Sequence, residues 1–402
     1  MPTLHFADAR ECVIREVRAV VLSSGPPPQQ EAAIPIADAA GRVLAEEASS
    51  DRDYPPVARS VRDGFAFRSA SVPGSLRIIG EVRAGEVYSG ETGAGEAVEI
   101  MTGAPVPRGS DAVIMVEHTR REGDSVIVDL PVRPGNAINR QGSEAQAGQV
   151  LLKPGRRLGY SEIALLATIG RDHIHVHRRP RVAILATGDE IVEISQTPLP
   201  YQVRNSNACA LAVQVARAGG VPEVLPVARD VYDSTRGLIE RGLRADLLLL
   251  SGGVSAGKYD IVERVLADLG AQFFFDRVLI QPGQPLVFGT ARGTFFFGLP
   301  GNPASTMVTF ELFARAAIDL LGGCDETPLP MPAARLTEAF RQKTGLMRFL
   351  PARLSADGSE VTPVQWQGSS DVPSLARSNA FLVTEEKRET WEAGDWIRVL
   401  SK

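Results

Sequence analysis

The most regular pattern of apolar and polar positions lies between residues 180 and 325. Continuous apolar runs at 182–186, 246–250 and 295–297 alternate with amphipathic stretches at 205–218 and 261–269 and with one that ends near residue 321. Short, wholly apolar strands that alternate with helices are typical of a parallel sheet covered on both faces. The pattern therefore predicts an α/β domain, whose helix at 205–218 is capped by Asn205.

The remainder of the chain follows two other patterns. Amphipathic runs predict helices at 6–22, at 37–48 with Asp38 as a possible N-cap, and at 160–169. Between residues 51 and 140, short alternating runs at 76–79, 97–101, 112–116 and 126–130 are separated by Gly, Pro and Asp, which predicts a compact β domain. Residues 328–402 repeat that texture and predict a small β-barrel or sandwich.

Composition narrows the class of protein. The 402 residues include 38 Gly and 28 Pro, which fits a globular chain with many turns. Lys and Arg number 43 against 48 Asp and Glu, so the net charge of −5 argues against a nucleic-acid partner. No apolar run is long enough to span a membrane and no secretory leader is visible, so we expect a cytoplasmic protein without a membrane partner.

The three cysteines lie far apart in the sequence, at positions 12, 209 and 324. They form no CxxC pair, and their small odd number fits a reducing compartment. Cys209 falls on a predicted helix, where we expect a buried apolar residue in preference to a nucleophile.

Three loops rich in small residues follow the predicted parallel strands. They begin at Thr187, Ser251 and Leu299, and the first carries the acids Asp189 and Glu190. Because ligands of such sheets bind beyond the carboxyl ends of the strands, we expect the loops to form one pocket. Small residues admit a ligand to the backbone and carboxylates suit a divalent cation, so the loops predict a site for a phosphorylated or otherwise anionic ligand. Each loop taken singly also fits ordinary strand-to-helix turn chemistry.

No nucleotide-binding fingerprint of the GxxxxGK[ST] or GxGxxG type occurs in the chain. In the predicted β domain, Asp63 precedes a glycine and Thr102 ends an apolar run. Taken alone, an Asp-Gly pair most often marks a turn, so these two residues gain meaning only from a wider context.

Taken together, the motifs resemble the molybdopterin molybdenumtransferase family, the MoeA-like proteins, which include the C-terminal region of animal gephyrin. The resemblance extends over nearly the whole chain. It is carried by seven segments in the family's order: 60–66, 99–105, 181–190, 204–210, 249–260, 279–288 and 297–305.

The resemblance implies a multidomain α/β fold with four domains. These would be a discontinuous helical domain (1–50 with 140–178), a β domain (51–139), a parallel α/β molybdopterin-binding domain (179–326) and a C-terminal β-barrel-like domain (327–402). It also implies an elongated homodimer, with the active cleft between the α/β domain of one chain and the β domain of its partner.

The resemblance further implies a reaction. Family members take adenylylated molybdopterin and molybdate, use Mg²⁺, and yield molybdenum cofactor and AMP, so other cofactor-maturation proteins are possible partners. The sequence leaves open whether tungstate replaces molybdate.

Residue roles follow from the matched motifs. The catalytic residues would be Asp63, Thr102, Glu190, Asp230 and Asp260, with Asp233 as a rival of Asp230, and Glu190 and Asp260 would hold the metal. The substrate pocket would be lined by Thr187, Gly188, Asp189, Ser251, Gly252, Gly253, Ser255, Gln281, Gln284, Pro300 and Asn302. The carboxylates would bind Mg²⁺ and orient the phosphoanhydride.

The chain departs from the family pattern at a few positions. Gln281 and Gln284 stand where two lysines are expected, Ser143 and Glu144 replace a Glu-Asp pair, and Arg62 stands where Met is common. Loss of one electrostatic contact to a transition state typically raises the activation free energy by roughly 3–4 kcal/mol. Three hypotheses follow: a working insertase, a catalytically weakened paralogue that carries molybdopterin or finished cofactor, and a purely structural scaffold.

Overall fold

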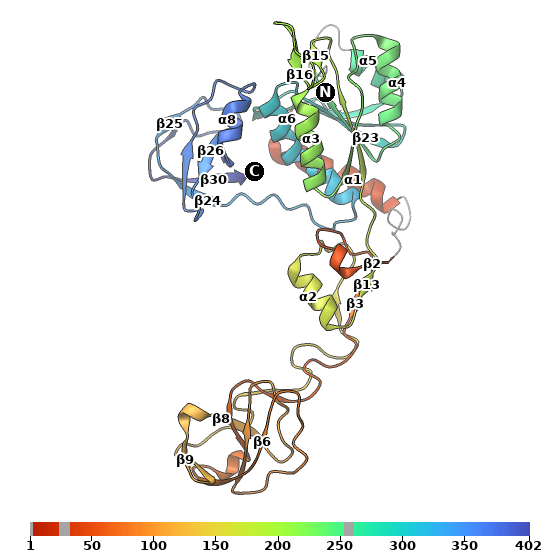
Figure 1. Ribbon diagram of the computed structural model, residues 1–402. Coiled ribbons are helices and arrows are strands. Elements are labelled where there is room, and N and C mark those ends of the chain that lie inside the picture. The colour runs from red at the N-terminus through yellow and green to blue at the C-terminus, as the bar shows by residue number, and fades with distance from the viewer. Residues whose placement is uncertain (1–2, 24–32, 253–260) are drawn as a thin grey trace.

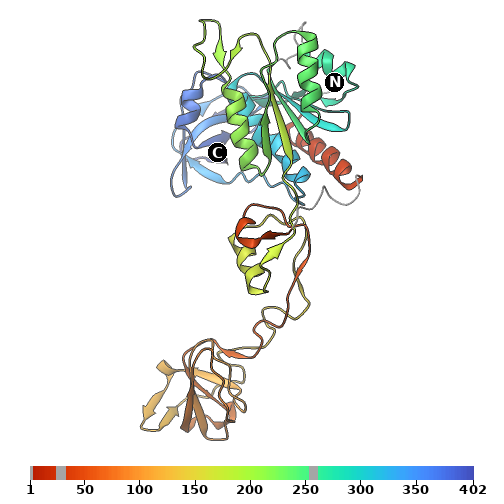
Figure 2. The ribbon, with the colours of Figure 1, turned by 45° about the vertical axis from the view of Figure 1, so that its right-hand side comes forward.

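The computed structural model describes residues 3–23, 33–252 and 261–402. It is elongated, with a wide upper part and a narrow extension that ends in a separate β unit (Figures 1 and 2). We call residues 33–177 the arm and the other described residues the body. None of the described helices combines the length and apolar character that crossing a membrane requires.

The body is built on a six-stranded sheet in the order β17-β14-β18-β23-β22-β19. Strands β14, β17, β18 and β23 are parallel; β22 runs antiparallel to β23, and the edge strand β19 runs antiparallel to β22 and so in the direction of the other four. The bounds are β14 Arg181–Ala186, β17 Val221–Val224, β18 Leu247–Ser251, β19 Gln272–Phe275, β22 Val287–Ala291 and β23 Thr294–Leu299. The predicted parallel α/β domain is thus confirmed.

Helices cover both faces of this sheet. On one face, α4 (Tyr232–Gly242) and α5 (Ile261–Asp268) enclose one apolar cluster; α3 (Ser206–Arg217) lies on the other. Beside α3 runs the helix predicted to end near residue 321, observed as α6 (Pro303–Thr309), a π-helical turn η4 (Phe310–Ala314) and α7 (Arg315–Leu321). Asn205 caps α3 as expected, because its side chain accepts a hydrogen bond from the Ala208 N–H at 3.2 Å. Cys209 on α3 is exposed, so its expected burial was wrong.

Helix α1 (Phe6–Ser23) packs against α7 in the core of the body. Its buried residues Ala9, Val13 and Val17 recur every four positions and form one apolar stripe. The structure therefore places this helix with the parallel sheet, whereas the expected division grouped it with residues 140–178. Side-chain periodicity predicts a stripe but not the surface that covers it.

The upper part of the arm carries α2 (Tyr160–Thr168), as predicted. The helix expected over 37–48 was wrong: only a short 3₁₀ turn, η1 (Ile36–Asp38), forms there. Beyond it the chain is extended and pairs with residues 156–158, since Leu44 N–H donates to Arg156 O and Leu158 N–H donates to Arg42 O, both at 2.9 Å. Pairing between distant segments overrides the local helical pattern here.

The lower part of the arm is a six-stranded sheet in the order β8-β5-β7-β6-β10-β9, as the alternating runs predicted. An apolar cluster packs on each side of it. The bounds are β5 Gly64–Phe67, β6 Gly74–Val82, β7 Glu96–Ile100, β8 Ala112–Met115, β9 Arg120–Glu122 and β10 Ser125–Val128, with short 3₁₀ turns η2 Ser69–Ser71 and η3 Val116–His118. Two short ribbons lead to it: β3 (Ala48–Ser49) with β12 (Val150–Leu152), and β4 (Arg59–Ser60) with β11 (Ile138–Asn139).

The C-terminal strands close into a five-stranded barrel, as the barrel-like prediction required. The circuit is β26-β27-β24-β30-β28, with β26 and β28 also paired. These strands are β24 Ala333–Leu336, β26 Met347–Leu354, β27 Glu360–Pro363, β28 Ala380–Val383 and β30 Trp396–Ser401, with helix α8 at Val372–Arg377. Strand β21 (Ile280–Gln281) of the body extends β26 in parallel, which attaches the barrel to the α/β core.

The remaining strands are short two-stranded pairs. They are β1 (Thr3–Leu4) with β20 (Arg277–Val278), β2 (Ile34–Pro35) with β13 (His173–Ile174), β15 (Ile191–Val192) with β16 (Val203–Arg204), and β25 (Phe340–Arg341) with β29 (Thr390–Trp391).

Gly64 provides a test of how tightly the lower sheet packs. A Cβ at this position would lie 1.8 Å from the Ile114 carbonyl oxygen on β8. We expect Gly64→Ala to lower the free energy of unfolding by about 3 kcal/mol, because the strand pair must separate to admit a methyl group. Gly237→Ala on α4 is the matched control: nothing lies within 4 Å, and we expect a gain of about 1 kcal/mol from helix propensity. Urea denaturation measures both, and equal stability of Gly64→Ala and wild type would contradict the close packing.

Candidate functional site

Three parallel strands end side by side at one edge of the body sheet. The register aligns Ala186 of β14 with Ser251 of β18, and Ser251 with Leu299 of β23. From β14 the chain goes outward to β17, and from β17 it crosses over to β18, so the strand order reverses between β14 and β18. This is the switch point at which open α/β sheets bind ligands.

A cavity of about 690 Å³ opens at this point, and we call it the strand-end cavity. Its wall joins the strand ends to the start of α3 and includes Thr187, Glu190, Arg204, Asn205, Asn207, Ser251, Gly252 and Asn302. The side chain of Asn207 donates to Ser251 Oγ at 2.9 Å and to the Gly301 carbonyl at 2.8 Å. It thereby ties α3 to both strand-end loops.

In the part of this wall that the structure describes, two buried polar atoms lack a hydrogen-bond partner. They are Thr187 Oγ1 and Asn207 Oδ1. Buried polar groups are nearly always paired, so an orphaned hydroxyl and amide oxygen in one cavity indicate a ligand that supplies hydrogen bonds. Gly252 lets such a ligand reach the backbone: its φ is +89°, and a Cβ would lie 2.7 Å from the Thr187 carbonyl oxygen.

A second cavity, of about 570 Å³, shares Glu190, Gly252 and Asn302 with the first. We call it the glutamine cavity, because Gln281 and Gln284 line it, together with Pro300 and other residues. Among its described lining residues Glu190 is the only charged one, and none is Lys or Arg. The two neutral amides therefore leave this cavity with no described cation.

The acids predicted at the strand ends lie close together. Asp189 Oδ1 accepts a hydrogen bond from the Asp230 N–H at 3.1 Å, and Glu190 faces both cavities. Partial burial raises the pKa of the Asp230 carboxyl above its ordinary value, and the negative charges of Asp189 and Glu190 raise it further. Asp233, the rival position, lies in the first turn of α4.

A cation would relieve the repulsion between these carboxylates, so the donor set has the chemistry of a hard divalent ion. The described residues nevertheless include no group of three or more His, Cys, Asp or Glu side chains already placed around one metal position. Asp260, the expected partner of Glu190, lies outside the described residues, and so do Gly253 and Ser255. A hydrogen bond from the Gly188 N–H to the Ala228 carbonyl, at 3.1 Å, holds Gly188 in position.

Asp63 and Thr102 lie together, but far from the other predicted residues. Asp63 Oδ1 accepts hydrogen bonds from the Thr102 N–H at 2.6 Å and from Thr102 Oγ1 at 2.7 Å. These bonds, the backbone one first, hold the pKa of the Asp63 carboxyl below its ordinary range. Both residues flank strands of the lower sheet, which lies away from the body (Figure 1), and Thr102 lines a cavity there together with Ser60 of β4 and Thr168 of α2. Within one chain, the structure does not bring them to the strand-end cavity or the glutamine cavity.

Sequence reasoning missed the contribution of the C-terminal segment. Trp366, Ser369 and Ser370 line the two cavities. Asn302 Nδ2 donates to Ser369 Oγ at 2.8 Å, and the Ser369 carbonyl accepts from the Ala304 N–H at 2.9 Å. The only local signal is a run of small residues, which is common in loops, so no pattern could have assigned it to the site.

Comparison with known proteins settles the family. Three family models cover most of the chain: the MoeA N-terminal region (domains I and II) over 4–170, a probable molybdopterin binding domain over 183–319, and the MoeA C-terminal region (domain IV) over 333–402. The chain is also 35% identical over 384 residues to a molybdopterin molybdenumtransferase of Bacillus subtilis, covering 91% of this chain and 89% of that protein. The chain belongs to the MoeA family.

Other MoeA relatives agree in sequence and in fold. A molybdopterin molybdenumtransferase of Nostoc is 38% identical over 294 residues, covering 70% of this chain and 67% of that one. The structure of a MoeA protein of molybdopterin biosynthesis from Pyrococcus horikoshii OT3 matches with a TM-score of 0.80 at 26% identity over 100% of both chains. A second Pyrococcus MoeA structure gives 0.70 at 31% identity, covering 96% of this chain and 98% of the other.

The Asp63–Thr102 pair can be tested by titration. We expect Thr102→Val to raise the pKa of Asp63 part of the way to its ordinary value, because the hydroxyl donor is lost and the N–H donor remains. Thr102→Ser keeps both donors and is the matched control. Folding lowers this pKa, so the pair stabilises the chain above the ordinary carboxyl pKa of about 3.9, and that stabilisation is lost as the pH falls. Carbon-13 NMR titration of the carboxyl measures the pKa, and an identical value in Thr102→Val and wild type would refute the assignment.

Proposed function

We propose that this MoeA protein inserts molybdenum into adenylylated molybdopterin in the cytoplasm, with Mg²⁺, and releases molybdenum cofactor and AMP. A role in molybdenum cofactor biosynthesis follows from its family and from relatives named molybdopterin molybdenumtransferase. The observation that carries the finer proposal is the pair of cavities that share Glu190, Gly252 and Asn302 at the strand ends. Two adjoining cavities can hold a large substrate and a second, smaller reactant.

The strand-end cavity suits the pterin and its phosphate. Thr187 Oγ1 and Asn207 Oδ1 have hydrogen-bonding capacity to spare for the polar edge of a pterin. Arg204 and the N-terminus of α3 supply positive potential for a phosphate. The glutamine cavity would then take molybdate, with amide N–H groups of Gln281 and Gln284 as its donors.

The acids next to the shared wall suit the metal. Glu190 and Asp260, which the family resemblance assigns to the metal, would hold Mg²⁺, which neutralises charge on a phosphoanhydride when it is bound. Asp189 has a positioning role, since its carboxylate holds the Asp230 backbone N–H at 3.1 Å. Cleavage of the P–O–P bond by water would give AMP and a free molybdopterin phosphate, leaving the dithiolene sulfurs to take up the metal from molybdate, or from tungstate.

We propose that Asp63 and Thr102 act in the cleft of a second copy. Within one chain they lie on the arm, whose lower sheet is away from the body, while an exposed carboxylate with a pKa held low stays ionised near neutral pH. In a homodimer, each arm would bring this pair to the strand-end site of its partner. One dimer would then carry two sites, each completed by the other chain.

A second candidate is a weakened paralogue that binds molybdopterin or finished cofactor and passes it to another maturation protein. The observation that favours it is the absence of Lys and Arg from the described lining of the glutamine cavity. An anionic reactant would bind there with less electrostatic stabilisation than beside two ammonium groups.

Turnover of adenylylated molybdopterin with Mg²⁺ and molybdate, read as AMP release, tests the proposal. We expect Glu190→Gln to reduce the rate roughly a hundredfold, because the shared wall loses its charge. Glu193→Gln is the matched control, since Glu193 is exposed and lines neither cavity. Wild-type protein that binds molybdopterin but releases no AMP would favour the carrier, and protein that binds neither form would overturn both candidates.

Mixing two inactive variants tests the shared cleft. If sites form between chains, Asp63→Ala mixed with Glu190→Gln restores about a quarter of wild-type activity, because half of the dimers are mixed and each has one intact site. The two variants measured separately are the control. No recovery after subunit exchange, shown by mass spectrometry, would place each site within a single chain.

The glutamines can be tested directly. We expect Gln281→Lys/Gln284→Lys to lower the molybdate concentration for half-maximal AMP release roughly tenfold, since two positive charges would face an oxyanion. Gln146→Lys, at an exposed position in the arm, controls for added charge away from the site. An unchanged half-saturation value in the double variant would show that these positions do not contact the reacting anion.

A further inference from the structure

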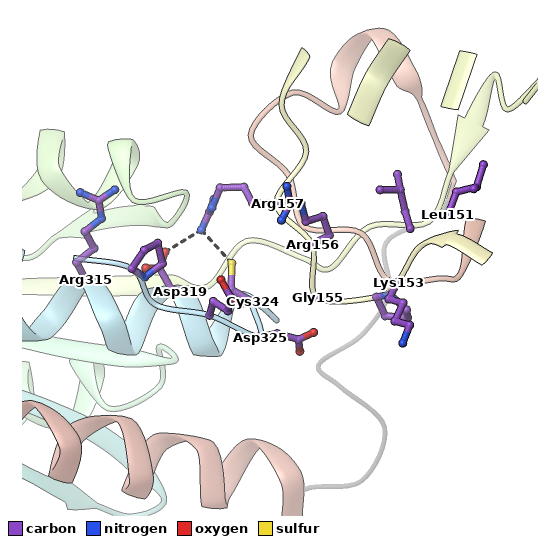
Figure 3. Close-up of a pocket in the computed structure, with 13 residues that line it drawn as sticks. Leu151, Lys153, Gly155, Arg156, Arg157, Arg315, Asp319, Cys324 and Asp325 are labelled. Carbon is purple, nitrogen blue, oxygen red and sulfur yellow. Dashed lines mark hydrogen bonds and ion pairs between the residues drawn. The ribbon is translucent and has the colours of Figure 1, made fainter. Parts of the chain in front are cut away.

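The arm meets the body at a narrow joint that is partly hollow. A cavity of about 560 Å³ lies there, lined from the arm by residues 151–157 and from the body by Arg315, Asp319, Cys324 and neighbouring residues. Figure 3 shows the two sides facing each other across this space. Because a cavity supplies no packing, the few direct contacts across the joint must set the direction in which the arm points.

Arg157 makes several of these contacts at once. Its Nη2 pairs with Asp319 Oδ1 of α7 at 2.8 Å and donates to Cys324 Sγ at 3.2 Å (Figure 3). The same nitrogen lies 3.4 Å from the Ala218 carbonyl at the end of α3, and Nη1 donates to the Gly41 carbonyl of the arm at 2.9 Å. One planar guanidinium therefore links a turn of the arm to three separate points of the body.

Leaving the buried Asp319 carboxylate without its Arg157 partner would cost free energy. It is 6% exposed, and burial raises the pKa of its carboxyl, while the charges of Arg157, Arg315 and Arg10 oppose that rise. Arg157 alone of these three donates a hydrogen bond to it. Loss of a partner from a buried ion pair leaves an uncompensated charge, so the pair strongly favours the one geometry in which it closes.

A close backbone approach accompanies the ion pair. The Asp325 N–H donates to the Gly155 carbonyl at 3.2 Å, and a Cβ on Gly155 would lie 2.3 Å from the Asp325 carboxyl carbon. The arm and the body are thus in contact at Gly155, which lies in a turn, and at Arg157, two residues further along the chain. The buried His177 ring of the arm also lies against Gly323 of the body, so the joint has packing contacts to which Arg157 adds directed hydrogen bonds.

We propose that Arg157, paired with Asp319, is a positioning residue that holds the arm at one angle to the body and so sets where Asp63 and Thr102 lie. This proposal rests on the function proposed above only for its catalytic consequence. The angle itself is a property of the chain. The described hydrogen-bond partners of Arg157 line neither the strand-end cavity nor the glutamine cavity, so its effect on the reaction passes through the arm.

A distance measurement tests the angle without any substrate. Asp129 in the lower sheet has a side chain that is 72% exposed, so Asp129→Cys provides one spin-label position; the exposed Cys209 of the body provides the other. Cys12 and Cys324 are buried, and burial raises the pKa of the Cys324 thiol to about 11, so neither reacts readily near neutral pH. Labelled chains diluted with unlabelled chains report the distance within one copy.

We expect one narrow distance distribution in this labelled protein. Arg157→Met and Asp319→Asn, each made in the labelled protein, should roughly double its width, because the directed contacts at the joint are lost. Arg157→Lys should give an intermediate width, since one ammonium keeps the charge but cannot reach all the acceptors. Circular dichroism and a thermal melt identify folded variants, and if one variant fails to fold, the other two decide.

Arg156→Met is the matched control. Arg156 precedes Arg157 in the chain, and its guanidinium pairs with Glu162 of the arm at 2.8 Å; toward the body it has a charge interaction with Glu326 but no described hydrogen bond. Its distance distribution should equal that of the parent. Unchanged widths in all the folded Arg157 and Asp319 variants, or equal broadening in Arg156→Met, would overturn the proposal.

Kinetic measurements then test whether the angle of the arm affects the proposed reaction. We expect Arg157→Met to lower kcat for AMP release roughly ten- to hundredfold, while the Kd for molybdopterin, which is bound by the body, stays unchanged. Equal losses in binding and turnover would indicate general damage to the body and contradict a positioning role. A wild-type protein without AMP release would refute the proposed function, whereas the distance result would still decide the role of Arg157.

Discussion

The parallel pairing of β14, β18 and β23 is the constraint on which the rest of the site depends. Its register aligns Ala186, Ser251 and Leu299, so three loops that are distant in sequence leave the sheet at one edge. Four successive leucines of β18, at 247–250, are buried, because apolar clusters cover both faces of the sheet. A shift of register by one residue would reverse the face of every side chain, so burial on both faces and the aligned loops are maintained together.

A second constraint is the separation of the chain into a body and an arm. The body carries the strand-end cavity and the glutamine cavity with Glu190 and Asp230 nearby, and the lower sheet of the arm carries Asp63 and Thr102. Within one chain, this arrangement keeps Asp63 and Thr102 apart from Glu190 and Asp230. The joint at Arg157 and Asp319 then matters for the site even though it lies outside it, because a small rotation there is amplified along the length of the arm.

Most elements of the body could be predicted from residue patterns, and two errors show where that reasoning ends. The runs at 182–186, 246–250 and 295–297 became β14, β18 and β23, because a wholly apolar run has few alternatives. Residues 37–48 have a helical pattern, but within them 42–44 pair in extended form with 156–158. Helix α1 was predicted correctly as a helix, but its stripe of Ala9, Val13 and Val17 does not specify α7 as the surface that covers it.

The sequence by itself determined the family, the strand-end loops with their small and acidic residues, and the neutral amides at 281 and 284, because these depend on residue type and short spacing. Only the tertiary structure decided that Ser369 of the C-terminal segment closes the cavities, that Thr187 and Asn207 keep unpaired polar atoms there, and that Arg157 meets Asp319. Those contacts join residues tens to hundreds of positions apart. Their geometry follows from how whole layers pack, which no local pattern of apolar and polar residues encodes.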